Sequence, residues 1–271
     1  MTHDLPLVLA AISYVLAAIF LYQSIRQQAA GGRSVSLSFA VVGVALHCVA
    51  QFDHWFAGAQ PDVSLPHLLS LCALVVIVIL VLSAFTQRTL YDAGLVALPL
   101  AAAMLLMEWI LPHDPIPMSE LSTGTSVHLV SSVLSFGLFS IAGVYALFVL
   151  IIDYFLRKHH LNPLVRTLPA LEILEDLLFK LIAAGFTLLT VSLASGMMFI
   201  NDIFAQHLVH KTILSILAWL VFGTLLLGRW RYGWRGSIAV RFTLIGIVLL
   251  LLAYFGSKLV LEMILGRNWQ A

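Results

Sequence analysis

The stretch LPHLLSLCALVVIVILVLSAF, residues 65–85, contains no charged side chain and is long enough to cross the apolar core of a membrane. A helix that spans a bilayer needs about 20 predominantly apolar residues. The stretch is too long for a typical β-strand and lacks the strict alternation of a half-buried strand. It therefore predicts a transmembrane helix.

Other stretches of the chain have the same character, and together they predict an all-α polytopic membrane bundle of about eight transmembrane helices. The apolar segments cover residues 5–25, 35–52, 65–85, 90–111, 127–156, 177–200, 212–227 and 238–265, the second and seventh being the shortest. Hydrophobic residues make up 61% of the chain and charged residues 10%, whereas globular domains carry about 25% charged residues. We therefore expect one integral membrane domain over residues 1–271, in contact with the lipid bilayer.

Basic residues gather in alternate connections between the predicted helices. The connections after the first, third, fifth and seventh helices carry most of them: Arg26, Arg33, Arg88, Arg157, Lys158, Arg166, Arg229, Arg231 and Arg235. Because cytoplasmic loops are enriched in Lys and Arg, these connections are predicted to lie in the cytoplasm. Both termini are then predicted to lie outside, in a multi-pass protein of the bacterial inner membrane.

Residues 158–176 mix bases, acids and apolar side chains, unlike the spanning segments. Leucines recur there at three- and four-residue steps, from Leu164 through Leu168 and Leu171 to Leu174. This pattern predicts an amphipathic cytoplasmic connector that lies on the membrane and is interrupted near Pro169. A solvated connector is the alternative.

Histidines are concentrated at one predicted face of the membrane. Eight of the ten map at or near the outer face: His3, His47, His54, His67, His113, His128, His207 and His210. Two of them, His47 and His128, lie inside predicted helices near their outer ends. Histidine is a common metal ligand and a common axial ligand of haem iron, so these two are candidate axial ligands. A neutral histidine that hydrogen-bonds between helices is the alternative.

Three further residues are weaker candidates at the same face. His207 and His210, three residues apart, suit a metal or transient haem contact, and a solvated interfacial loop explains them as well. Met198 is a potential soft axial ligand, with helix packing as the alternative. Glu108, near the outer end of its helix, is expected to be interfacial.

Several functions are disfavoured by missing motifs. The sequence has no P-loop and no HExxH motif, so it predicts neither ATP-driven transport nor metal-dependent hydrolysis. Few carboxylates fall deep within the predicted helices, which argues against a proton-coupled transporter. We expect a protein that is not an enzyme and that does not bind nucleic acid.

Several stretches resemble one known family. They begin with Leu46-His47 and continue with the run 127–136 that contains His128, Asp153-Tyr154, the run 211–219, Gly233-Trp234-Arg235-Gly236 and the run 252–257. Together they resemble the CcsA/HemX-like cytochrome c assembly superfamily, and most closely its YpjD-type inner membrane proteins. The resemblance implies a cytochrome c assembly-like core over about residues 60–265, which handles haem at the outer face.

The same resemblance implies roles for particular residues. His128 takes the place of an outward-facing haem-ligating histidine, and His47 fits a membrane histidine of the YpjD-type branch. The chain also departs from the haem-exporting members, because residues 204–210 replace a Trp-rich segment and residues 261–267 contain no histidine. These departures argue against synthesis of holocytochrome c by this chain.

The sequence thus supports a leading hypothesis and a rival. The leading one is a membrane protein that binds b-type haem through His47 and His128 and serves haem handling or cytochrome complex assembly, with a membrane or cytoplasmic protein as a further partner. The rival is a haem-free structural or regulatory subunit that scaffolds a partner. In that case the histidines serve only to join helices.

Overall fold

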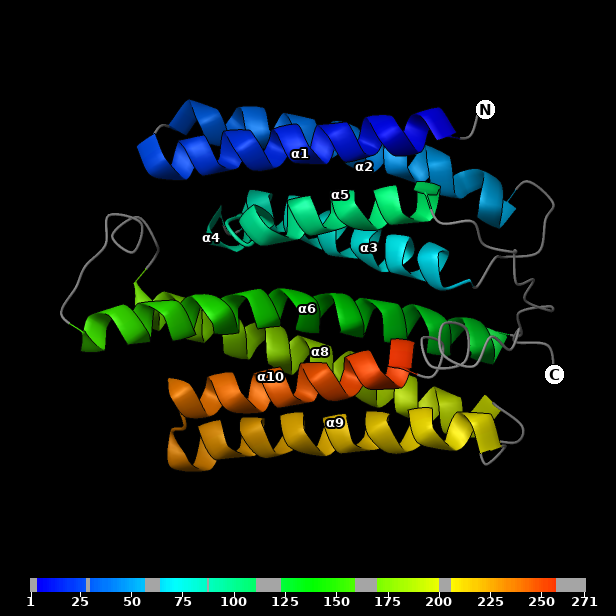
Figure 1. The fold of residues 1–271 in the computed structure, drawn as a ribbon. Coiled ribbons are helices and arrows are strands. Elements are labelled where there is room, and N and C mark those ends of the chain that lie inside the picture. Colours follow the sequence, from blue (N-terminus) through cyan, green and yellow to red (C-terminus); the bar gives the residue numbers. More distant parts are fainter. Residues whose placement is uncertain are drawn as a thin grey trace. The chain divides into compact units, whose positions relative to one another are not determined.

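A computed structural model of the chain describes residues 4–27, 30–56, 64–86, 88–110, 123–158, 170–199 and 206–256 (Figure 1). These residues form helices and short turns, with no strand in the described ranges. The predicted all-α polytopic fold is therefore confirmed. Within these described ranges, seven helices are long and apolar enough to cross a membrane, and an eighth apolar helix is shorter.

The described residues divide into two compact units. Unit 1 contains Met1–Glu120 with Phe155–Ala170, and unit 2 contains Leu121–Tyr154 with Leu171–Ala271. Each unit places its helices side by side (Figure 1), as expected where lipid cannot satisfy exposed backbone groups.

Unit 1 is built from α1 (Asp4–Gln27), α2 (Ala30–Phe56), α3 (Leu65–Thr86), the single turn α4 (Arg88–Tyr91) and α5 (Gly94–Ile110). Helix α1 packs against both α2 and α5, and α3 packs against α2, α4 and α5. The side chain of Tyr14 is completely buried in this bundle. Phe20 of α1 stacks on Phe39 of α2, with ring centroids 5.4 Å apart.

The fourth predicted segment, residues 90–111, is not one continuous helix. A turn at Asp92 and Ala93 separates α4 from α5, and its hydrogen bonds run from Asp92 N–H to the Thr89 carbonyl and from Leu95 N–H to the Asp92 carbonyl. Asp92 is held there by an ion pair with Arg33 of α2. As a result α5 has 17 residues, whereas α2 and α9 have 27 each. The expectation that the second and seventh helices are shortest is therefore wrong.

Unit 2 is built from α6 (Thr123–Arg157), α8 (Leu171–Phe199), α9 (Gln206–Tyr232) and α10 (Ser237–Leu251), followed by the π-helical turn η1 (Leu252–Gly256). Aromatic rings join its helices. Phe139 of α6 stacks on Phe222 of α9 at 3.9 Å between centroids. Trp219 of α9 stacks on Phe186 and donates its indole N–H to Thr190 Oγ1 of α8.

The predicted connector, residues 158–176, is described only at its two ends. Lys158 follows the last turn of α6, and residues 159–169 lie outside the described residues. From Leu171 onward the chain is already in α8, which continues without a break to Phe199. An amphipathic helix before Leu171, like the orientation of the termini, stays a prediction.

The turn between α9 and α10 is tied to α8. Gly233 adopts a left-handed conformation with φ of 66° and donates its N–H to the Arg229 carbonyl, which ends α9 as an αL cap. Glu175 of α8 accepts a 2.7 Å hydrogen bond from Gly236 N–H and lies 3.4 Å from Arg235 Nε. Two segments far apart in sequence are therefore joined at this end of unit 2.

Candidate functional site

The two histidines singled out from the sequence lie in different units. His47 belongs to α2 of unit 1, and His128 to the first turns of α6 in unit 2. We therefore describe the surroundings of each imidazole within its own unit.

His47 is completely buried, and both of its ring nitrogens make hydrogen bonds. Nδ1 lies 3.2 Å from the Tyr14 hydroxyl of α1, and Nε2 lies 2.9 Å from the Ser70 hydroxyl of α3. A hydroxyl can donate or accept, so either neutral tautomer satisfies this arrangement. As the structure stands, His47 offers no nitrogen lone pair to an iron atom, and its surroundings do not fit an axial ligand.

His47 belongs to a larger buried group, which we call the polar cluster. Gln51 donates its amide N–H to the same Ser70 hydroxyl at 3.1 Å, and His67 Nδ1 lies 3.0 Å from Glu108 Oε1. The members of the polar cluster are Tyr14, His47, Gln51, His67, Ser70 and Glu108. They come from α1, α2, α3 and α5, so every long helix of unit 1 contributes.

Glu108 is a correction to the sequence analysis. Its carboxylate was expected at the interface, but the residue is only 6% exposed and contacts the completely buried His67. The reason is the paired histidine, since an ionisable group inside a membrane protein is tolerated mainly where it has a partner. The sequence offered two signals for this pair. His67 stands at the start of one apolar run, and Glu108 stands near the end of the next.

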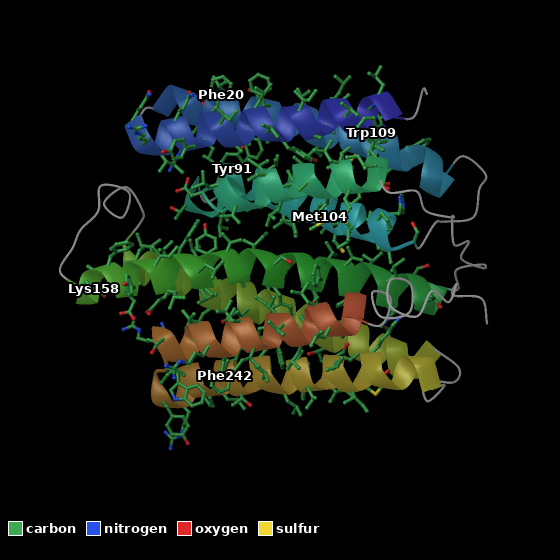
Figure 2. The ribbon with its side chains drawn as sticks, in the orientation of Figure 1. Phe20, Tyr91, Met104, Trp109, Lys158 and Phe242 are labelled. Carbon is green, nitrogen blue, oxygen red and sulfur yellow. The ribbon has the colours of Figure 1, made fainter. Side chains whose placement is uncertain are left out.

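The opposite end of unit 1 carries a second buried carboxylate. Both Asp92 oxygens accept hydrogen bonds from Arg33 Nη2, at 2.8 and 2.9 Å. Figure 2 labels Tyr91 and Trp109, the chain neighbours of Asp92 and Glu108, at the two ends of the α4–α5 segment. Burial raises the pKa of the Asp92 carboxyl to about 6, and the Arg33 guanidinium opposes that rise.

His128 of unit 2 has different surroundings, and the described residues engage only one of its ring nitrogens. Nδ1 donates to the Ser192 carbonyl of α8 at 2.8 Å. No other residue in the described part of the chain hydrogen-bonds Nε2. Because a carbonyl can only accept, Nδ1 must carry the proton, and the neutral ring then has its lone pair on Nε2. Metal-ligating histidines commonly make this bond with their second nitrogen, so His128 fits one axial position on a haem iron.

Small residues hold the His128 ring against α8. A Cβ added at Gly196 would lie 2.9 Å from Nδ1 and 3.0 Å from Cε1 of His128, so only glycine allows this approach. Ser132 of α6 hydrogen-bonds the Ser192 hydroxyl, and Ser135 donates to the Gly185 carbonyl at 2.9 Å. These contacts bring α6 and α8 close together and fix the imidazole.

The positions of the three weaker candidates, Met198, His207 and His210, give less support to a role as ligands. Met198 lies in the last turn of α8 with 79% of its surface exposed. His207 and His210 lie in the first turns of α9, and their side chains fall outside the described residues. Within the described ranges, no group of three or more His, Cys, Asp and Glu side chains is arranged to hold a metal ion.

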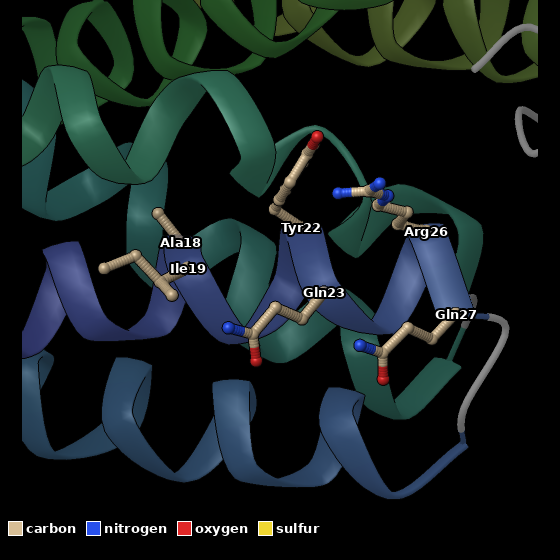
Figure 3. A pocket seen from close by; sticks show the side chains of 6 residues that line it. All are labelled: Ala18, Ile19, Tyr22, Gln23, Arg26 and Gln27. Atoms are coloured by element: carbon tan, nitrogen blue, oxygen red, sulfur yellow. The ribbon is translucent and has the colours of Figure 1, made fainter. Parts of the chain in front are cut away.

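A shallow hollow of about 470 Å³ lies along the C-terminal half of α1 (Figure 3). It is lined by Ala18, Ile19, Tyr22, Gln23, Arg26 and Gln27. Its lining includes neither His47 nor His128, so it is not a pocket of the histidine sites.

Comparison with known proteins identifies the family. The sequence pattern of the family described as "Cytochrome C assembly protein" matches residues 5–265. The chain belongs to this family. The resemblance that the sequence stretches predicted is therefore confirmed.

Three relatives illustrate how far the similarity extends. The inner membrane protein YpjD of Escherichia coli (strain K12) is 31% identical over 262 residues, covering 94% of this chain and 97% of YpjD. Protein HemX of Brevibacillus brevis is 25% identical over 56% of this chain and 58% of its own length. The cytochrome c biogenesis protein CcsA of Synechococcus sp. (strain CC9605) is 29% identical over 32% of this chain and 30% of its own length. No solved structure matches the chain.

Proposed function

We propose that this protein handles haem for the assembly of cytochrome complexes in the bacterial inner membrane, with His128 as an axial ligand of b-type haem. Membership of the cytochrome c assembly family and similarity to YpjD and CcsA support this role and location. The observation that carries the proposal is the His128 imidazole, with Nδ1–H bonded to the Ser192 carbonyl and Nε2 available.

Each part of the His128 site has a distinct task. The Ser192 carbonyl fixes the tautomer and orients the ring, and Gly196 leaves the space that the ring occupies. A bound haem would supply an iron centre for ligation and electron transfer. No catalytic residue is part of this proposal, and the protein acts as a binder rather than an enzyme.

The second ligand is a separate question. The sequence hypothesis of a bis-histidine site requires His47 to give up its hydrogen bond with Tyr14 or with Ser70. Both bonds are buried, and loss of the first would leave the Tyr14 hydroxyl without the partner that it has in the structure, at about 1–3 kcal/mol. We therefore assign the ligand role to His128 alone, and the role of His47 stays a prediction.

The reduced-minus-oxidised absorption spectrum of the full-length protein in detergent tests this function. We expect a b-type spectrum in the wild type that is lost in His128→Gly and restored by added imidazole, because free imidazole can occupy the vacated space. His47→Ala should retain the spectrum. Loss in both variants would favour the bis-histidine site. Absence of a Soret band in the wild type, even after haem is added, would instead favour the haem-free scaffold.

A further inference from the structure

Glu108 is buried, and the described residues engage only one of its two carboxylate oxygens. Oε1 lies 3.0 Å from His67 Nδ1, whereas Oε2 is buried without a hydrogen-bond partner among the described residues. The oxygen lacks a partner whether or not His67 is protonated, because that histidine nitrogen reaches Oε1. Buried polar atoms in folded proteins are nearly always satisfied, so such an atom calls for an explanation.

Gln51 of α2 also has a buried side-chain oxygen without a hydrogen-bond partner among the described residues. Its amide nitrogen donates to Ser70 Oγ, and its buried Oε1 accepts no hydrogen bond from the described residues. In this orientation the amide nitrogen takes the Ser70 hydroxyl as its acceptor, and the carbonyl oxygen is left over. Ser70 and His67 are three residues apart on α3 and so lie on one face of the helix. Gln51, which bonds Ser70, and Glu108, which bonds His67, therefore contact consecutive turns on one face of α3.

Asp92 shows how unit 1 treats a buried carboxylate that has a protein partner. It is 5% exposed, much like Glu108, yet both of its oxygens accept from Arg33. The polar cluster contains neither lysine nor arginine. The two carboxylates therefore differ in their partners: a guanidinium contacts both oxygens of Asp92, whereas an imidazole contacts one oxygen of Glu108.

We propose that Glu108 Oε2 and Gln51 Oε1 hold a small monovalent cation, an alkali-metal ion, inside unit 1. Carboxylate and amide oxygens are ligands that hard cations prefer. With His67 neutral, the carboxylate supplies one negative charge, and a monovalent ion leaves the site neutral, which minimises the cost of burying charge in a membrane. Softer transition metals favour nitrogen or sulfur donors, and no suitable group of three is present in the described ranges.

Thermal melting of the full-length protein in detergent tests this site at pH 7.5 and constant ionic strength. NaCl, KCl and choline chloride are compared, together with direct binding of radioactive sodium. We expect Tm to be several degrees higher in the favoured alkali salt than in choline, because an ion that binds only the folded state stabilises it. Binding should saturate at one ion per chain. Glu108→Gln should abolish both effects, and Gln51→Leu should weaken binding about tenfold.

Asp92→Asn is the matched control, because it alters the other buried carboxylate of the same unit. It should lower Tm and keep the full difference between alkali salt and choline. Equal melting of the wild type in all three salts would overturn the proposal, as would sodium binding that survives in Glu108→Gln. Should Glu108→Gln not fold, undiminished binding in Gln51→Leu would overturn the amide ligand. The haem spectrum is expected to be unchanged in these variants, so this site and the proposed function can fail separately.

Discussion

His47 and His128 show the same side chain used in two ways by the two units of one membrane protein. His47 is sealed in unit 1, with hydroxyl groups on both ring nitrogens. His128 is only partly buried, with one nitrogen on a backbone carbonyl and the other available. The first pattern joins three helices, whereas the second prepares a ligand. The hydrogen bonds of the two ring nitrogens therefore distinguish a structural histidine from a ligand in a transmembrane helix.

The sharpest test of this comparison is the stability of two alanine variants. His47→Ala should lower the free energy of unfolding by about 3 kcal/mol, because it leaves a cavity and removes a partner from two buried hydroxyls. His128→Ala should cost about 1 kcal/mol, since it removes one hydrogen bond at a half-buried site. Denaturation in mixed micelles measures both. Equal losses in the two variants would show that His128 is also structural.

A smaller effect is expected from crowding the His128 ring. In Gly196→Ala the new methyl group would displace the imidazole from the Ser192 carbonyl, so haem affinity should fall about tenfold, or about 1.4 kcal/mol. Haem titration followed by absorbance measures this change. Gly223→Ala is the control in the same unit, because its Cβ would meet only the Phe186 ring, at 3.3 Å. Similar affinities in the two variants would contradict the positioning role of Gly196.

A third test distinguishes the units by the response of their stability to pH. The folded-state pKa of Asp92, about 6, lies above its ordinary value of 3.8, so folding takes up a proton between these values. This contribution to stability is complete below pH 3.8 and is lost as pH rises through 6. The contribution of Asp92 to the change in free energy of unfolding with pH should stay below about 1.4 kcal/mol per pH unit. Unfolding of the wild type and of Asp92→Asn from pH 4 to 7 isolates it. Identical slopes would show that Arg33 keeps the carboxyl ionised throughout.

The sequence was sufficient for the helices and insufficient for their contacts. The apolar segments 65–85 and 127–156 correspond to α3 and α6 within a few residues at most ends, because length and hydropathy are local properties. The break at Asp92 was missed, and the side chain that pairs with Asp92 comes from Arg33, 59 positions earlier in the chain.

The candidate site was predicted only in part for the same reason. His128 was selected from the sequence, but its orientation depends on Ser192 and Gly196 of another helix. His47 was selected as well, and the bonds that occupy both of its nitrogens come from α1 and α3. Hydropathy does not report which faces of two helices meet. The candidate histidines could therefore be selected from the sequence, but the hydrogen-bond partners of their ring nitrogens could not be predicted.

The contact of Glu175 with the turn after α9 has a consequence for biosynthesis. Glu175 leaves the ribosome about 60 residues before Arg235 and Gly236, the groups that it contacts in the finished protein. Until they emerge, its carboxylate lacks the backbone N–H and the guanidinium that it contacts in the folded chain. The last helical hairpin then closes the contact. Completion of synthesis, rather than insertion of α8, is the event that fixes this end of unit 2.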